Sequence, residues 1–80
     1  MIYYVALPFV RVDGGLAPGD AVECPHAAAA IRRAEALAGK EANAGAVAFW
    51  RQGSSDLGEF EDAVILKVFG DVPDDFLFVT

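Results

Sequence analysis

Two side chains that can act as nucleophile and base, Cys24 and His26, lie two residues apart in the chain. A thiol at the start of a helix can become reactive. Residues at this spacing point to different faces of a helix, however, so the two side chains should not reach hydrogen-bond distance. One cysteine and one histidine also cannot form a zinc site of ordinary spacing within one chain. We expect Cys24 to be a capping or packed residue and His26 to lie at the surface.

Four carboxylates gather within one short stretch, at Asp56, Glu59, Glu61 and Asp62. Calcium takes such oxygen ligands, but the spacing does not follow the D-x-[DN]-x-[DN]-G pattern with a closing glutamate. As a general acid and base pair, these groups have no nucleophile or oxyanion-stabilising group near them in the sequence. We expect a solvated acidic turn. The sequence predicts no catalytic residue, no metal and no cofactor, and therefore no enzyme.

Glycines and aromatic residues offer two further kinds of chemistry. The glycines at 13–15 and 18–19 lack the lysine of a phosphate-binding loop and the G-x-G-x-x-G spacing, so they indicate turns. Tyr3, Tyr4 and Trp50 are of the type that stacks nucleic-acid bases on a sheet. Six Lys and Arg against twelve Asp and Glu give a net charge of -6, which argues against nucleic acid as a partner. Packing in a core or an interface explains the aromatic residues better.

The charge is concentrated in one third of the chain. Residues 53–80 carry -6, residues 24–52 carry +2 and residues 1–23 carry -2. An apolar chain, here 55% hydrophobic, stays dispersed by carrying charge of one sign. The alternative is an acidic patch for a basic protein partner. Negative charge is also repelled by the anionic face of a membrane.

The chain shows no signal for a membrane or for secretion. The longest uncharged run, residues 1–10, is short of the about 18 residues of a spanning helix. No Lys or Arg precedes this run, as a secretion signal would require. One cysteine cannot form an internal disulfide, which fits a reducing compartment. We therefore predict a cytoplasmic protein with no membrane contact.

The N-terminal part is predicted to form strands. Residues 1–12 are rich in Tyr, Val, Phe and Ile and are apolar on both faces. Pro8 cannot donate a ladder hydrogen bond, which predicts an edge position or a bulge. Turn signals follow at 13–15 and 18–19, and residues 21–23 are a candidate return strand.

A helix is predicted from about residue 25 to residue 42. Pro25 suits the first helical position, which places Cys24 at the cap. Gly39 either ends the helix or weakens it. Apolar residues at helical spacing form one face: Ala27, Ala30, Ile31, Ala34, Leu37 and Ala38.

Two strands are predicted after the helix. Residues 45–52 place Val47 and Phe49 on one side and Ala46, Ala48 and Trp50 on the other. Residues 53–59 indicate a loop. The β-branched content of residues 60–69 favours a strand over a helix.

These elements predict one α+β domain over residues 1–80, of order β-β-α-β-β, with one alanine-rich helix on a mainly antiparallel sheet. Residues 71–80 are expected to be a flexible or interface-forming tail. The helix covers one sheet face, and the strands are apolar on both, so something should cover the other face. The candidates are the C-terminal segment or a second copy, and a two-fold homodimer is favoured for so small a chain. The expected contact residues are aromatic: Phe9, Phe49, Trp50, Phe76 and Phe78.

The stretches GAVAFWRQG and GEFEDAVILKVFGDVP, behind the alanine helix, resemble short bacterial proteins of unknown function. The resemblance implies no activity. We expect a non-enzymatic module that self-associates and binds protein. Two alternatives stay open: a nucleic-acid-related protein and a small-ligand binder. The first would bind directly through Arg11, Arg32, Arg33 and Arg51 or would mimic DNA with its acidic third.

Overall fold

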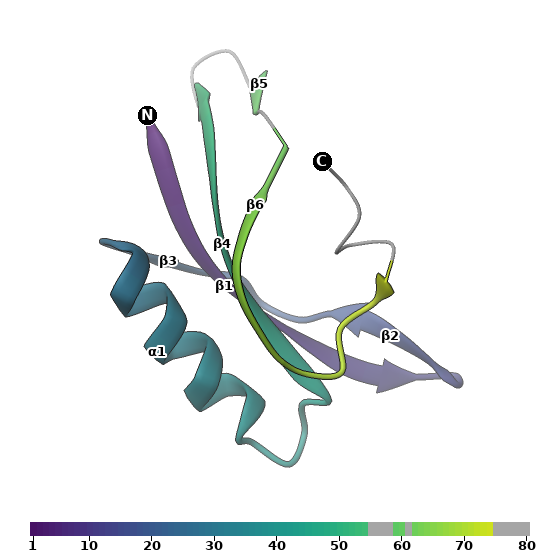
Figure 1. Cartoon of the computed structure of the whole chain (residues 1–80). Coiled ribbons are helices and arrows are strands. Elements are labelled where there is room, and N and C mark those ends of the chain that lie inside the picture. The colour runs from purple at the N-terminus through teal and green to yellow at the C-terminus, as the bar shows by residue number, and fades with distance from the viewer. Residues whose placement is uncertain (55–58, 61, 75–80) are drawn as a thin grey trace.

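Two long neighbouring strands form the centre of the sheet (Figure 1). The computed structural model describes residues 1–54, 59–60 and 62–74. In it, β1 (Ile2–Val12) pairs antiparallel with β4 (Gly45–Ser54), from Ile2 opposite Gln52 to Phe9 opposite Gly45. Both strands were expected from their apolar residues, and β4 extends two residues further than predicted.

Four shorter strands flank this central pair. β2 (Gly15–Pro18) and β3 (Val22–Cys24) both pair with β1, and β5 (Glu59–Phe60) and β6 (Val64–Gly70) both pair with β4. All pairings are antiparallel. The predicted α+β class, one helix on a mainly antiparallel sheet, is confirmed. The structure has two more strands than the predicted order β-β-α-β-β. The additional strands are β2, which precedes β3, and β5, which precedes β6.

A tight turn joins β1 to β2. Its two central residues, Asp13 and Gly14, have φ angles of 47° and 79°. Two successive positive φ values match the right-handed twist of a hairpin, and Asp-Gly is a preferred pair for them. The turn predicted at this point is therefore confirmed.

Pro8 does not lie in an edge strand, contrary to the prediction, but within the central strand β1. β3 pairs with residues 4–6 of β1 and β2 with residues 9–12, which leaves a gap beside Pro8. The Pro8 carbonyl oxygen faces this gap, where it accepts a hydrogen bond from the Gly19 N–H at 2.8 Å. The ring nitrogen faces the same side, so the missing donor costs no ladder bond.

The helix α1 (Ala27–Ala38) is shorter than predicted at both ends. His26, not Cys24, is the N-cap: its backbone is extended and its Nδ1 accepts from the Ala29 N–H at 3.1 Å. Gly39 is the C-cap, as one reading of the sequence expected. Just beyond it, the Asn43 amide donates to the Leu37 carbonyl oxygen at 2.8 Å, which satisfies a carbonyl at the helix end.

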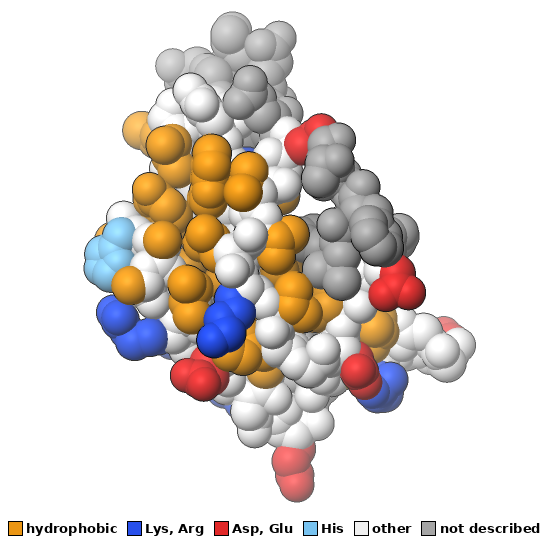
Figure 2. Space-filling model, in the orientation of Figure 1, with side chains coloured by type: hydrophobic (Ala, Val, Ile, Leu, Met, Phe, Trp, Pro, Cys, Tyr) orange, Lys and Arg blue, Asp and Glu red, His pale blue; other side chains and the backbone are white. Residues whose placement is uncertain are grey.

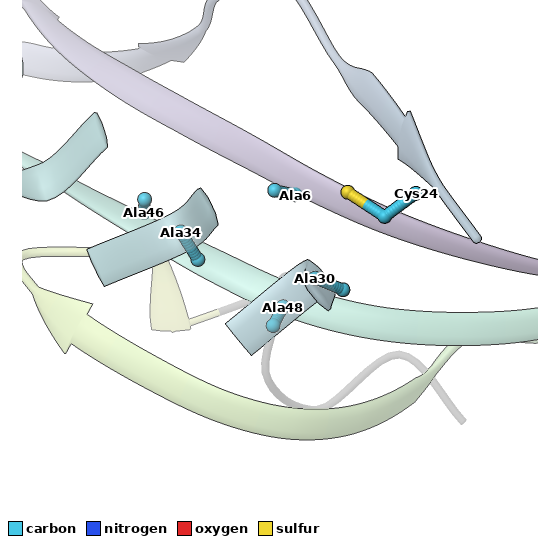
Figure 3. Packing of buried hydrophobic residues seen from close by; sticks show 6 residues of the cluster. All are labelled: Ala6, Cys24, Ala30, Ala34, Ala46 and Ala48. Carbon is cyan, nitrogen blue, oxygen red and sulfur yellow. The ribbon is translucent and has the colours of Figure 1, made fainter. Parts of the chain in front are cut away.

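Alanine packs against alanine between α1 and the sheet. Figure 3 shows Ala30 and Ala34 of the helix close to alanines of β1 and β4, with Cys24 of β3 beside them. Ala6, Ala46 and Ala48 supply the strand side of this contact. All five alanines are fully buried. Methyl groups allow the helix to lie close to the sheet.

The opposite face of the sheet has a core of its own, made of larger side chains. Val5, Phe9, Val47 and Phe49 form it, and each is at most 9% exposed. Ala63 and Val72, on either side of β6, are among the residues that pack against it. The alternation predicted for β4 is therefore confirmed on both faces.

The second predicted strand after the helix is also present, as β6. Its register shifts between Lys67, opposite Ala48, and Ile65, opposite Phe49. Leu66 is thus the extra residue of a β-bulge, and its side chain packs against the helix-side cluster. The predicted C-terminal tail lies outside the described residues from residue 75 onward.

Candidate interaction surface

Cys24 and His26 each form a hydrogen bond with nearby backbone. Cys24 is buried at the end of β3, and its thiol donates to the Val22 carbonyl oxygen at 3.6 Å. The His26 ring is engaged with the backbone of α1 through its Nδ1. Each side chain is therefore held by the backbone of its own neighbourhood.

The acidic stretch is described only in part. Asp62 is exposed, whereas Asp56 and Glu61 lie outside the described residues, and the placement of the Glu59 side chain is not described either. Within the described ranges, no group of three or more His, Cys, Asp and Glu side chains is placed to hold a metal ion.

The arginines expected for direct nucleic-acid binding do not share one face. Arg11 forms an ion pair with Asp71, at the end of β1 away from the N-terminus. Arg51 belongs to the β4 face opposite α1, where Val47 and Phe49 also lie. Arg32 and Arg33 are exposed on α1. In Figure 2 the basic side chains are scattered among acidic ones rather than gathered.

The five expected contact residues are dispersed as well. Phe9 and Phe49 are 2% and 6% exposed, so within one chain they serve the core opposite the helix. Trp50 alternates with Phe49 and therefore belongs to the helix side, where it is half-buried. Phe76 and Phe78 lie outside the described residues. Of the three expected contact residues that the structure describes, only Trp50 is partly exposed.

Trp50 is the middle of a row of apolar side chains that crosses three strands. Tyr4 of β1 is opposite Trp50, and Trp50 is opposite Val64 of β6. Ile2, two residues before Tyr4, is on the same face. We call Ile2, Tyr4, Trp50 and Val64 the Trp50 patch.

The Trp50 patch lies beyond the N-terminal end of α1. The next row of the same face, Ala6 opposite Ala48, is the one that α1 covers. Tyr4 is opposite Cys24, and Cys24 precedes the first helical residue by three positions. β1 and β4 therefore extend beyond the N-terminal end of α1. Figure 2 shows hydrophobic side chains gathered there over β1, β4 and β6. Ile2 and Val64 are 47% and 44% exposed.

The alternation of β4 was the signal that placed Trp50 on the helix side. Tyr4 and Val64 join it only through strand register, which pairs residues far apart in the sequence. The point at which α1 stops covering the sheet depends on the connection from Cys24 to Ala27. Neither feature is visible in local patterns.

The chain matches no protein-family model, no curated protein and no solved structure. In the part of the chain that the structure describes, no helix is long and apolar enough to cross a membrane.

Proposed function

We propose that this protein is a non-enzymatic interaction module that associates with a second copy of itself through the Trp50 patch. The observation that carries the proposal is an uncharged apolar row, in register across three strands, in which Trp50 is half-buried and Val64 is 44% exposed. Aromatic side chains are enriched at protein interfaces, and this row places Tyr4 beside Trp50. A tryptophan at the centre of such a patch suits an anchor residue.

The size of the patch sets the strength of the association. Three strands spaced ~4.8 Å apart and two rows of side chains span about 200 Å² per copy, and the patch fills about two thirds of this area because the polar Gln52 is opposite Ile2. Burying the apolar part on two copies contributes about 7 kcal/mol at ~25 cal/mol per Å². Association itself costs an estimated ~4–15 kcal/mol, so the two nearly cancel. We therefore expect a weak homodimer whose population rises with protein concentration.

A second copy fits the patch better than a basic protein does. The Trp50 patch carries no charge, so an oppositely charged partner finds no ion pair there. Two copies, each with a net charge of -6, repel one another at long range, and salt screens this repulsion. Dimerisation should therefore strengthen as salt rises, whereas binding of a basic protein to an acidic patch would weaken.

The sheet edges favour contact through a face rather than through strand addition. β6 carries a bulge at Leu66, and the other edge is divided between two short strands separated by residues 19–21. Bulges and short strands are features that prevent edge-to-edge pairing.

Light scattering over a concentration series tests this proposal. Wild-type mass should rise from 8.5 kDa towards twice that value, at lower concentration in high salt than in low salt. Val64→Lys places a charge in the patch on each copy and should hold the protein monomeric over the same range. A wild-type protein that stays monomeric at every concentration and salt level would overturn the proposal.

Val12→Lys is the matched control. Val12 is 45% exposed, against 44% for Val64. It lies opposite Gly15, at the end of β1 that is far from Ile2 and the Trp50 patch. Both substitutions add one positive charge to an exposed strand valine. Only Val64→Lys should move the mass curve, and an equal shift in both variants would contradict the assignment to the Trp50 patch.

A further inference from the structure

A groove of about 450 Å³ lies between the C-terminal half of α1 and the β2–β3 connection, away from the Trp50 patch. Val10, Val22 and Leu37 line it with apolar surface. Gly19, which has no side chain, and Ala36, which has only a methyl group, also line it and leave space open. The volume is in the range of sites that hold small molecules.

Two cations also line the groove. Arg33 and Lys40 are seven residues apart on and just after α1, so they lie on the same side of the helix as Ala36 and Leu37. Across the part of the chain that the structure describes, neither forms an ion pair with a carboxylate. Asp20 is the one carboxylate that lines the groove, which leaves an excess of one positive charge.

The C-terminal end of a helix disfavours the binding of an anion, because its last carbonyl groups carry partial negative charge. Here two of those carbonyls accept hydrogen bonds from residues beyond the helix. Leu37 accepts from the Lys40 N–H and from the Asn43 amide, and Glu35 accepts from the Gly39 N–H. The two full positive charges therefore determine the sign of the groove more than the helix end does.

We infer that this groove binds a small carboxylate that carries an apolar chain. The carboxylate lies against Arg33 and Lys40, and the chain lies on Val10, Val22 and Leu37. Both cations of the groove belong to the stretch of residues 24–52, which carries +2 in a chain whose net charge is -6. Their charge favours an anion over a cation at this place. The inference is independent of the proposed self-association.

A titration with three probes of equal chain length tests the inference: octanoate, 1-octanol and octylammonium. Backbone amide resonances of the full chain report both the place and the strength of binding. Octanoate should shift the resonances of Gly19, Val22 and Lys40 and bind most tightly, and octylammonium should bind most weakly. Equal binding of all three probes, shifts centred on Tyr4 and Trp50, or no shift at all would each overturn the inference.

Arg33→Gln and Arg32→Gln are matched variants of exposed neighbours on α1, and only Arg33 lines the groove. An ion pair at the surface contributes about 0.2–1 kcal/mol. Arg33→Gln should therefore weaken octanoate binding by a factor of about 1.4 to 5. Arg32→Gln should leave it unchanged, and neither should alter 1-octanol binding. An equal loss of octanoate affinity in both variants would show attraction to the whole helix and not to this groove.

Discussion

At the start of α1, the imidazole of His26 is the N-cap, a position at which Ser, Asp or Asn is usual. Its Nδ1 accepts a hydrogen bond from the third helical residue, Ala29, in the geometry of an N-cap. The first turn of the helix has no acidic side chain to interact with the helix dipole. The cap is thus an imidazole nitrogen, and no carboxylate in this turn adds to it.

We expect His26→Asp to raise the free energy of unfolding by about 0.5–1 kcal/mol, because a carboxylate accepts the same N–H and is favoured at a helix N-terminus. His26→Ala should lower it by about 0.5–1 kcal/mol through loss of the cap. Chemical denaturation of the three proteins measures both changes. If His26→Ala left the free energy of unfolding unchanged, the Nδ1 hydrogen bond would not stabilise the helix.

Gly45, at the start of β4, has backbone close by on several sides. A Cβ at this position would lie 2.5 Å from the Asp71 nitrogen and from the Phe69 oxygen, and it would also meet the Asp71 oxygen. These are backbone atoms, which cannot turn aside as the end of a side chain can. Only glycine permits this approach of β4 to the end of β6.

Gly45→Ala should therefore destabilise the protein by about 1–3 kcal/mol. Gly15→Ala is the control, since the nearest atom to its added Cβ would be 3.7 Å away. That change should stay within about 0.5 kcal/mol. Urea unfolding of both variants decides the point, and equal stability of the two would mean that β6 is not held against Gly45 in solution.

At the scale of elements, small side chains determine how closely α1 lies to the sheet. Ala30 and Ala34 meet Ala6, Ala46 and Ala48 with no exposed surface left (Figure 3). Such a contact buries little area per residue, and alanine's helix propensity offsets part of that loss. It also leaves no room for a larger group.

Ala34→Leu should lower the free energy of unfolding by about 1–3 kcal/mol, because the added atoms force the helix away from the sheet. Ala28→Leu makes the same change at an exposed position of the same helix. Alanine and leucine differ little in helix propensity, so this control should stay within about 0.5 kcal/mol. Thermal unfolding of the pair tests the contact, and an unchanged Ala34→Leu protein would rule it out.

Local patterns predicted the elements whose burial follows a simple period. The alternation in β4 separated Val47 and Phe49 from Ala46 and Ala48, and the spacing in α1 identified Ala30 and Ala34 as buried. Local patterns did not predict the features that depend on pairing between residues far apart in the sequence. Pro8 lies in a central strand only because β2 and β3 leave a gap beside it, which no local signal reveals.

The candidate surface shows the same division. Trp50 was an expected contact residue, while Ile2 and Val64 were not. They belong with Trp50 through the register of β1, β4 and β6, and a shift of one residue would move a strand's side chains to the other face. Phe9 and Phe49 were expected at a contact because the face opposite the helix was taken as open. In the structure both are buried.

At the scale of the whole molecule, the two faces of the sheet differ in what remains exposed. The face opposite the helix has a buried core of Val and Phe side chains. The helix side is fully buried over the Ala6 and Ala48 row and partly exposed over the Trp50 patch (Figure 2). The net charge of -6 then opposes, at long range, the association that the apolar patch favours.

The dissociation constant of the homodimer should therefore fall as salt is raised from about 0.01 M to about 1 M, where the Debye length shrinks from ~30 Å to ~3 Å. Sedimentation equilibrium at several salt concentrations measures this trend. A dissociation constant that rises with salt would instead indicate a contact built on ion pairs, which the uncharged Trp50 patch does not provide.

The most direct test of the central claim is the fluorescence of the chain's single tryptophan, recorded over a concentration series in high salt. Since Trp50 is half-buried in one copy and covered in the dimer, its emission should shift to shorter wavelength as the mass doubles, with the same midpoint. An emission maximum that stays constant while the mass doubles would contradict the account, because the copies would then meet through another surface.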